Sequence, residues 1–124
     1  MTNDHRKQAA LDFLRAARRG DRDGAAAFLA AGARHHNAYF AAGMDTLLTA
    51  IVAAAQANPM GTMDVKHVLG DGDFVAVHSH VRQRPDDRGV AVVHLFRFVG
   101  DRIAEMWDVG QPIPAENPNR DGMF

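Results

Sequence analysis

The sequence predicts an α+β fold in which three amino-terminal helices pack on a strongly curved antiparallel sheet around a central pocket. Apolar residues recur at helical spacing as far as Pro59, and beyond it they alternate with a period of two between short turns. Strands that are joined by short turns pair antiparallel. The 124 residues have the length of one domain, which we place at residues 1–124.

The first helix is expected at Asp4–Arg19. Thr2 or Asn3 is the candidate cap at its start, and Gly20 is the residue that would end it in a left-handed conformation. The stripe that should face the core consists of residues at the spacing of one helical face: Ala9, Ala10, Phe13, Leu14 and Ala17.

Two further helices are expected before Pro59. The second begins after Asp21, carries an inner face of alanine, phenylalanine and leucine, and closes at Gly32. The third covers Asp45–Ala57 and stops at Asn58-Pro59.

Four strands are expected after Pro59, each bounded by residues that favour turns. From Gln111 onward the chain is proline-rich and has no periodicity, so we expect an extended arm there. The strands are placed at residues 63–68, 74–84, 90–99 and 102–109.

Composition excludes several classes of protein. The 14 Lys and Arg residues balance 15 Asp and Glu, so we expect neither nucleic acid nor a membrane as a partner. The absence of cysteine excludes disulfides, thiolate metal sites and cysteine nucleophiles. The longest apolar stretch, Leu47–Ala55, is too short to span a bilayer, and Met1–Lys7 is unlike a signal peptide, so a cytoplasmic location is expected.

His94 is the most informative polar residue, because it lies in a strand of large apolar side chains. The face of that strand without Arg97 is the better candidate for the interior, and it holds His94. A buried imidazole needs a partner. The alternative interpretation is a histidine that is simply packed in the structure.

Asp108 is a candidate partner for His94. Alternation places it on the face of Met106; a His–Asp pair in a pocket supports general acid/base chemistry. His94 is six residues before Gly100 and Asp108 is seven after Asp101. On two antiparallel strands joined at this turn, the two residues are therefore expected one position away from lying directly opposite each other. The opposite face of this strand is also apolar, since it carries Ile103, Trp107 and Val109. An exposed Asp108 therefore stays possible.

The segment Arg34–Tyr39 is polar without any apolar pattern to explain it. It lines the mouth of the pocket or forms an exposed loop. Histidines also raise a metal hypothesis, because His78 and His80 share a strand face and His94 could join them as a third zinc ligand. Their spacing matches no metal signature, so we expect no metal and no cofactor.

The segment Val93–Pro114 resembles the last hairpin of SnoaL-like proteins in the NTF2-like superfamily. That hairpin reads as a Phe-Arg strand, a turn with glycine, and then Ile-x-Glu-x-Trp-Asp-x-x-Gln-Pro. His36-Asn37 resembles the family's His-Asn after the second helix, and Val77–His80 resembles a frequent strand signature. With the similar tail Gly122–Phe124, the resemblance covers nearly the whole chain.

The resemblance implies an NTF2-like cone with a deep pocket, usually in a homodimer. Better-known relatives are polyketide cyclases, which close a ring by intramolecular aldol condensation without a cofactor, and Asp108 matches the segment of their acid/base aspartate. A steroid delta-isomerase is a more distant relative. It carries an oxyanion-binding acid in the place of His94 and its general base near Asn37. Asparagine cannot act as a base, so steroid isomerisation is not expected.

Two functional hypotheses follow. In the first, the chain is a cofactor-free enzyme that abstracts a proton from a carbonyl compound, with Asp108 as acid/base and His94 as its partner or as the oxyanion donor. In the second, a non-catalytic protein binds a small hydrophobic ligand in the same pocket or uses its curved sheet as an interaction module. A homodimer is expected because both faces of the strand 74–84 are apolar. The residues expected to bind the substrate are His36, Asn37, Phe13, Phe96 and Met106.

Overall fold

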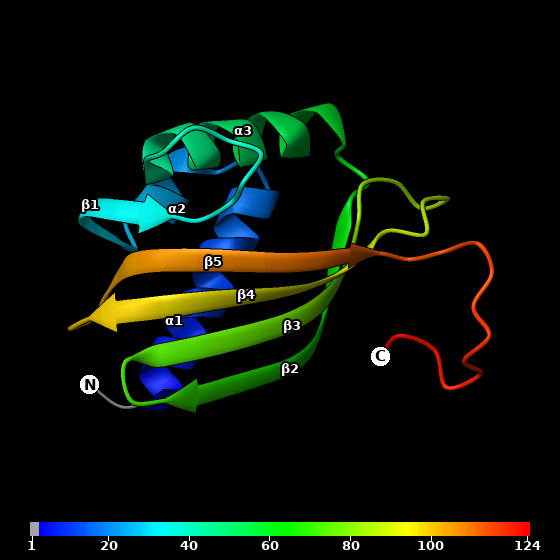
Figure 1. Ribbon diagram of the computed structural model, residues 1–124. Helices are drawn as coiled ribbons and strands as arrows, with labels where there is room; N and C mark the ends of the chain where they lie inside the picture. Colours follow the sequence, from blue (N-terminus) through cyan, green and yellow to red (C-terminus); the bar gives the residue numbers. More distant parts are fainter. Residues whose placement is uncertain (1–2) are drawn as a thin grey trace.

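The computed structural model describes residues 3–124 and confirms the α+β fold, with the helices on one side of a single curved sheet (Figure 1). The five strands have the spatial order β1-β5-β4-β3-β2. In chain order the elements are α1 (Asn3–Arg18), α2 (Arg22–Ala26), β1 (Leu29–His35), α3 (Met44–Ala57), β2 (Thr62–Asp71), β3 (Phe74–Arg82), β4 (Val90–Val99) and β5 (Arg102–Pro112).

The first helix ends as the sequence predicts. Gly20 has a φ of 79°, its N–H donates to Ala17, and the N–H of Asp21 donates to the Ala16 carbonyl. This is the Schellman pattern that stops a helix at a left-handed glycine. At the other end Asn3 is already part of α1, and the alternative cap Thr2 lies outside the described residues.

The prediction for the second helix is wrong over its second half. α2 ends at Ala26, and Leu29–His35 form an edge strand that pairs parallel with β5. Pairing with a sheet edge overrides the helix preference of this alanine-rich segment. Gly32, with a φ of 70°, lies in the irregular part of that pairing and does not end a helix.

The four strands predicted after Pro59 are confirmed, and β5 runs three residues further than expected. Residues up to Pro112 belong to β5, so the arm begins at Ile113 and not at Gln111. Two β-bulges interrupt the alternation, one at Lys66 in β2 and one at Ala104 in β5. Each bulge reverses the faces of the residues that follow it.

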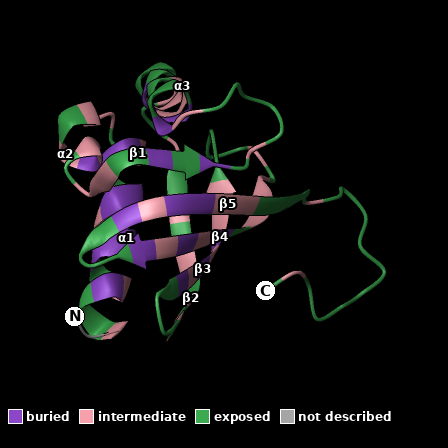
Figure 2. Cartoon of the chain, turned by 60° about the vertical axis from the view of Figure 1, so that its left-hand side comes forward, coloured by how far each residue is buried: buried purple, intermediate pink, exposed green. Residues whose placement is uncertain are grey.

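The core lies between the helices and the inner, concave face of the sheet (Figure 2). As predicted, the face of β4 with Phe96 and Phe98 is the inner one, since both side chains are fully buried. The outer face carries residues that stay exposed, among them Val93 and Val109. No helix within residues 3–124 is both long and apolar enough to cross a membrane.

A buried arginine ties the amino-terminal half of α1 to the sheet. The guanidinium of Arg6 donates to the carbonyl oxygens of Gly72 and Gly100 and to the carboxylate of Asp73, at 2.9–3.1 Å. All of these acceptors lie in the two hairpin turns at one end of the sheet. Arg6 is therefore a buried cation whose hydrogen bonds are provided by the fold itself.

Candidate active site

The loop after β1 holds Asn37 in place through a set of local hydrogen bonds. The imidazole of His35 is buried, and its Nε2 lies 2.8 Å from the carbonyl oxygen of Ala41 while its Nδ1 accepts the Asn37 N–H at 3.0 Å. These two contacts fix the tautomer with the proton on Nε2. The Asn37 Oδ1 accepts the N–H of Tyr39 at 2.9 Å, which leaves the amide NH2 free to point at the sheet.

Asn37 donates that NH2 to Asp108, and this bond defines the site. The distance from Nδ2 to Oδ2 is 2.8 Å, between residues that are 71 positions apart in sequence. The parallel pairing of β1 with β5 brings them together, because His35 is the register partner of Met106. Asn37 and Asp108 both line a cavity of about 400 Å³ whose wall also includes Val90, Val92 and Tyr39.

His94 lies directly opposite Asp108 on the neighbouring strand. The bulge at Ala104 removes the offset of one position that the sequence predicts. Next to the turn, Phe98 pairs with Ile103. If that register continued without the bulge, His94 would pair with Trp107 and Asp108 would turn to the outer face. The bulge also explains why Ile103 and Met106 are both buried although alternation alone assigns them to opposite faces.

The imidazole of His94 is neutral at pH 7. Burial lowers its pKa from 6.5 to about 4; the Asp108 carboxylate acts in the opposite direction, and the charge of Arg18 adds to the lowering. Its Nδ1 is buried without a hydrogen-bond partner in the described structure. A buried polar atom in that state calls for a partner, which a water molecule or a ligand can supply.

Ser79 on β3 carries a second buried polar atom without a partner. Its Oγ is fully buried, and its register partner on β4 is Val92, two residues from His94 on the same face. Two unsatisfied atoms therefore lie diagonally across adjacent strands on the inner face. The sequence analysis did not select Ser79; its alternation with Val75 and Val77 is the signal that could have found it.

Arg18 is the last residue of α1, and its charge acts on His94. It lines a cavity of about 210 Å³ together with the small side chains of α3, Phe40 and Gln83. Burial lowers the pKa of its guanidinium. The sequence analysis did not select it; its position four residues after Leu14, on the inner stripe of α1, is the signal that could have done so.

The comparison with known families agrees with this architecture. A family model described as the SnoaL-like domain matches residues 10–106, which run from α1 into β5. The chain belongs to the SnoaL-like domain family. Among curated proteins, none matches its sequence.

Solved structures show which fold this SnoaL-like domain shares. AclR, a candidate hydroxylase from Streptomyces galilaeus, is 21% identical with a TM-score of 0.72, over 89% of this chain and 91% of that chain. A candidate polyketide cyclase from Sinorhizobium meliloti is 22% identical with a TM-score of 0.68, over 82% and 94%. A candidate ketosteroid isomerase from Kribbella flavida is 18% identical with a TM-score of 0.72, over 96% and 87%. At such identities the likeness establishes the NTF2-like fold and not an activity.

His36 borders the cavity of this SnoaL-like domain, but its ring is held on the outer face of the sheet. It stacks on Trp107 with ring centroids 4.9 Å apart, and its Nε2 lies 2.5 Å from Oε2 of Glu105. Glu105 also accepts a hydrogen bond from Arg97 and pairs with Arg34. The His36 hydrogen bond, above all, lowers the pKa of Glu105, so a role in joining β1 to β5 accounts for His36 without a substrate.

Phe13, Phe96 and Met106 lie in the core beneath the site. All three are almost completely buried, Phe13 meets Phe96 edge to face with ring centroids 5.8 Å apart, and none of them is among the residues that line the cavity with Asp108. Their predicted contact with a substrate stays a prediction. In the present structure they support the strand segments that carry His94 and Asp108.

The histidines of the metal hypothesis lie on opposite faces of the sheet. His78 and His80 are on the outer face, where both rings meet Phe124 of the arm, whereas His94 points inward. The bulge at Lys66 places His67 on the outer face too, 3.0 Å from His78 between their Nδ1 atoms. Across residues 3–124, no three His, Asp or Glu side chains gather closely enough to hold a metal ion.

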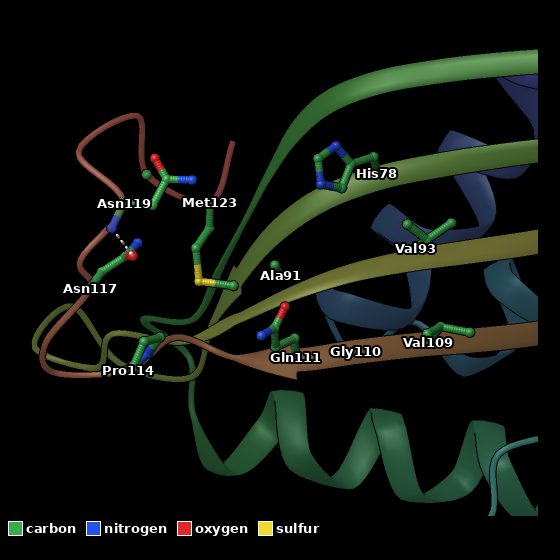
Figure 3. Close-up of a pocket in the computed structure, with 11 residues that line it drawn as sticks. His78, Ala91, Val93, Val109, Gly110, Gln111, Pro114, Asn117, Asn119 and Met123 are labelled. Atoms are coloured by element: carbon green, nitrogen blue, oxygen red, sulfur yellow. Dashed lines mark hydrogen bonds between the residues drawn. The ribbon is translucent and has the colours of Figure 1, made fainter.

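A larger hollow, of about 480 Å³, lies between the outer face and the arm (Figure 3). His78 is the only titratable side chain in its lining, which otherwise consists of apolar and amide groups such as Val93, Val109 and Asn117. It offers no carboxylate that could act as a base. Size alone would select this hollow, but the chemistry favours the inner cavity at Asp108.

Proposed function

We propose that this SnoaL-like domain is an enzyme that abstracts a proton next to a carbonyl group and stabilises the resulting enolate. One observation carries the proposal. A carboxylate, Asp108, is oriented by Asn37 at the wall of a cavity, directly opposite a buried neutral imidazole, His94, whose Nδ1 has no partner. A base and a donor for the developing charge are the two parts that enolate chemistry requires.

The roles follow from the hydrogen bonds. Asn37 occupies Oδ2 of Asp108, so Oδ1 is the oxygen that takes the proton from carbon. As the C–H bond breaks, its electron pair forms the enolate, and negative charge develops on the carbonyl oxygen. His94 is neutral and can donate a hydrogen bond to that oxygen without giving up its proton, and the hydroxyl of Ser79 is a second donor. Asp108 then returns its proton to another carbon, or to the alkoxide formed when the enolate attacks a second carbonyl.

Both outcomes occur among the chemistries named for proteins of this fold. The structural relatives include a candidate polyketide cyclase and a candidate ketosteroid isomerase, and both reaction types pass through an enolate. The residues of this chain perform acid/base steps by themselves, so we propose a cofactor-independent cyclase or isomerase. Either outcome needs one carboxylate that takes and then returns the proton, and Asp108 is that carboxylate in the proposal.

Proton abstraction can be measured before the natural substrate is known. Incubation of the protein in D2O with small ketones such as cyclopentanone and 4-oxopentanoate should exchange α-hydrogens for deuterium faster than buffer does, followed by proton NMR. Asp108→Asn should lower this rate by roughly a hundredfold or more, the usual size of a general-base contribution. The matched control Asp101→Asn changes an exposed aspartate of the hairpin turn and should leave the rate unchanged.

Two results would contradict the catalytic role. One is an exchange rate in the wild-type protein no higher than in buffer with every ketone tried. The other is an Asp108→Asn variant with wild-type exchange. If the variant still bound these ketones within a few fold while exchange was absent from both proteins, the alternative of a non-catalytic binding protein would be favoured.

We also propose that the domain forms a homodimer through the outer face of the sheet. That face exposes apolar side chains that water solvates poorly: Val109 is 71% exposed, Val93 is 37% exposed and Phe74 is 38% exposed. A second copy of the chain offers a matching apolar face by two-fold symmetry. Light scattering should give about twice the mass of the 13.5 kDa chain at micromolar concentration, and a monomer there would contradict the proposal.

A further inference from the structure

We propose that Arg18 binds a carboxylate of the substrate, so that this domain acts on an oxo acid and not on a neutral ketone. The inference rests on the proposed function for the role of the oxo group. Recognition of the carboxylate is a separate claim, and it depends on a residue that takes no part in proton transfer.

Arg18 differs from the other arginines of α1 in what surrounds it. Arg6 is buried and donates its hydrogen bonds to carbonyl oxygens and a carboxylate, while Arg15 is exposed to solvent. Arg18 is half-buried, and within residues 3–124 its side chain has neither a hydrogen bond nor an ion pair. Its guanidinium therefore has no acceptor within the fold, and the carboxylate of a ligand that enters the cavity could supply one.

The cavity at Arg18 suits the body of a small organic acid. Its remaining wall is mostly apolar, and Gln83 is the one other polar side chain in it. A planar guanidinium binds a carboxylate through two parallel hydrogen bonds. The apolar wall is formed by Phe40 and by the small or branched residues of α3, which are Ala50, Ile51, Ala54 and Ala55.

The charge of the site favours a carboxylate over a phosphate dianion. Arg18 is the only cationic side chain in this lining. It also sits at the carboxyl end of α1, where the helix dipole is negative and opposes a second negative charge on the ligand. A ligand with a single negative charge is therefore the best match.

The same arrangement orients the ligand. The loop after β1 lines both cavities, because Phe40 lies in the wall at Arg18 and its neighbour Tyr39 in the wall at Asp108. The charges of Arg18 and Asp108 both act on His94. A carboxylate on the ligand is attracted to Arg18 and repelled by Asp108, so these charges favour one orientation of the bound ligand. The oxo group then points to His94, and the carbon beside it faces Asp108. The ligand class is thus an acid whose oxo group is separated from its carboxylate by a short carbon chain.

Binding of 4-oxopentanoate and of its neutral analogue 4-oxopentanamide tests the proposal directly. The dissociation constant of each is measured by NMR titration. The wild-type protein should bind the acid at least about tenfold more tightly, the low end for a hydrogen-bonded charge pair. Arg18→Met should abolish this preference, Arg18→Lys should keep part of it, and the control Arg15→Met on the same helix should keep all of it. A wild-type protein without preference for the acid, or an Arg18→Met variant that retains the preference, would overturn the assignment.

Thermal melting separates ligand binding from a structural role. Methionine fills a similar space without a charge, so Arg18→Met should melt at or above the wild-type temperature in the absence of ligand. A marked loss of stability in that variant would overturn the proposal, because it would show that Arg18 has a partner in the fold.

The two proposals fail in different ways. If the acid binds through Arg18 but its α-hydrogens do not exchange, carboxylate recognition stands and the catalytic function falls. If the amide exchanges as fast as the acid and Arg18→Met changes neither rate, the catalytic function stands and carboxylate recognition falls.

Discussion

The buried His94 should make the fold sensitive to acid in a defined pH window. In the unfolded chain its imidazole takes up a proton near pH 6.5, whereas in the folded chain burial lowers the pKa to about 4. The unfolded state therefore binds more protons between these values, and the free energy of unfolding falls as the pH decreases through the window. Above about pH 6.5 the full stability is present, and the loss is complete near pH 4.

The size of the effect follows from the two pKa values. Between pH 7.5 and about pH 5 the free energy of unfolding should fall by roughly 2 kcal/mol. This follows because it falls by ~1.4 kcal/mol for each pH unit over which only the unfolded state is protonated. That is a large fraction of the total stability of a domain this size. His94→Leu removes the titrating group while keeping an apolar side chain, so the difference in unfolding free energy between wild type and variant should change by that amount.

Urea unfolding followed by circular dichroism at about pH 7.5, 6 and 5 measures this difference. His5→Leu is the control, since it replaces an exposed histidine of α1 and should leave the pH dependence in place. Glu105 also has a lowered pKa, but its contribution is lost only as the pH falls below the usual carboxyl range, and it is present in both proteins. If the difference between wild type and His94→Leu were the same at pH 7.5 and pH 5, the argument from burial would be refuted.

Three further predictions concern the loop, the outer face and the arm. His35→Leu removes both contacts that hold the loop, so exchange catalysed by Asp108 should fall about fivefold through loss of the Asn37 hydrogen bond, whose net worth is on the order of 1 kcal/mol; an unchanged rate would show that Asn37 is held by other means. Val109→Glu places a charge in the proposed dimer face and should give a monomer in light scattering, whereas a dimer that survives would place the interface elsewhere. Deletion of residues 117–124 removes Phe124 from its stacking on His80, at 4.8 Å between ring centroids, and should lower the melting temperature by a few degrees; an unchanged temperature and assembly would show that the arm is idle.

The fold was predictable from the sequence where local pattern and final structure agree. The inner face of β4 follows from alternation, because Phe96 and Phe98 share it and Arg97 does not. The end of α1 follows from Gly20, because a left-handed glycine stops a helix whatever the tertiary context. The edge strand β1 was not predictable in this way. Its alanine-rich residues favour a helix, and they become a strand only because the edge of β5 is available to them.

The candidate site was only partly predictable, because its polar groups depend on contacts between distant elements. Asp108 and His94 were identified from their strands, but their direct opposition depends on the bulge at Ala104, which no local residue pattern announces. Arg18 and Ser79 were missed because each is one polar residue at the edge of an apolar stripe. In a sequence, such a residue usually indicates a solvated surface position. Only the structure, which shows burial and the lack of a partner, distinguishes a candidate site residue from a surface residue.

The two irregular features of β5 have a common consequence. Parallel pairing with β1 delivers the loop with Asn37 to the carboxyl-terminal half of this strand, and the bulge at Ala104 turns Asp108 to the inner face at the same place. Either change alone would fail: without β1 the carboxylate would lack its amide partner, and without the bulge Asp108 would face outward opposite Val93. The bulge also serves packing, since it lets Ile103 and Met106 both face the core. The coincidence of the two features at one carboxylate, opposite an unpartnered imidazole, is the arrangement on which the proposed function rests.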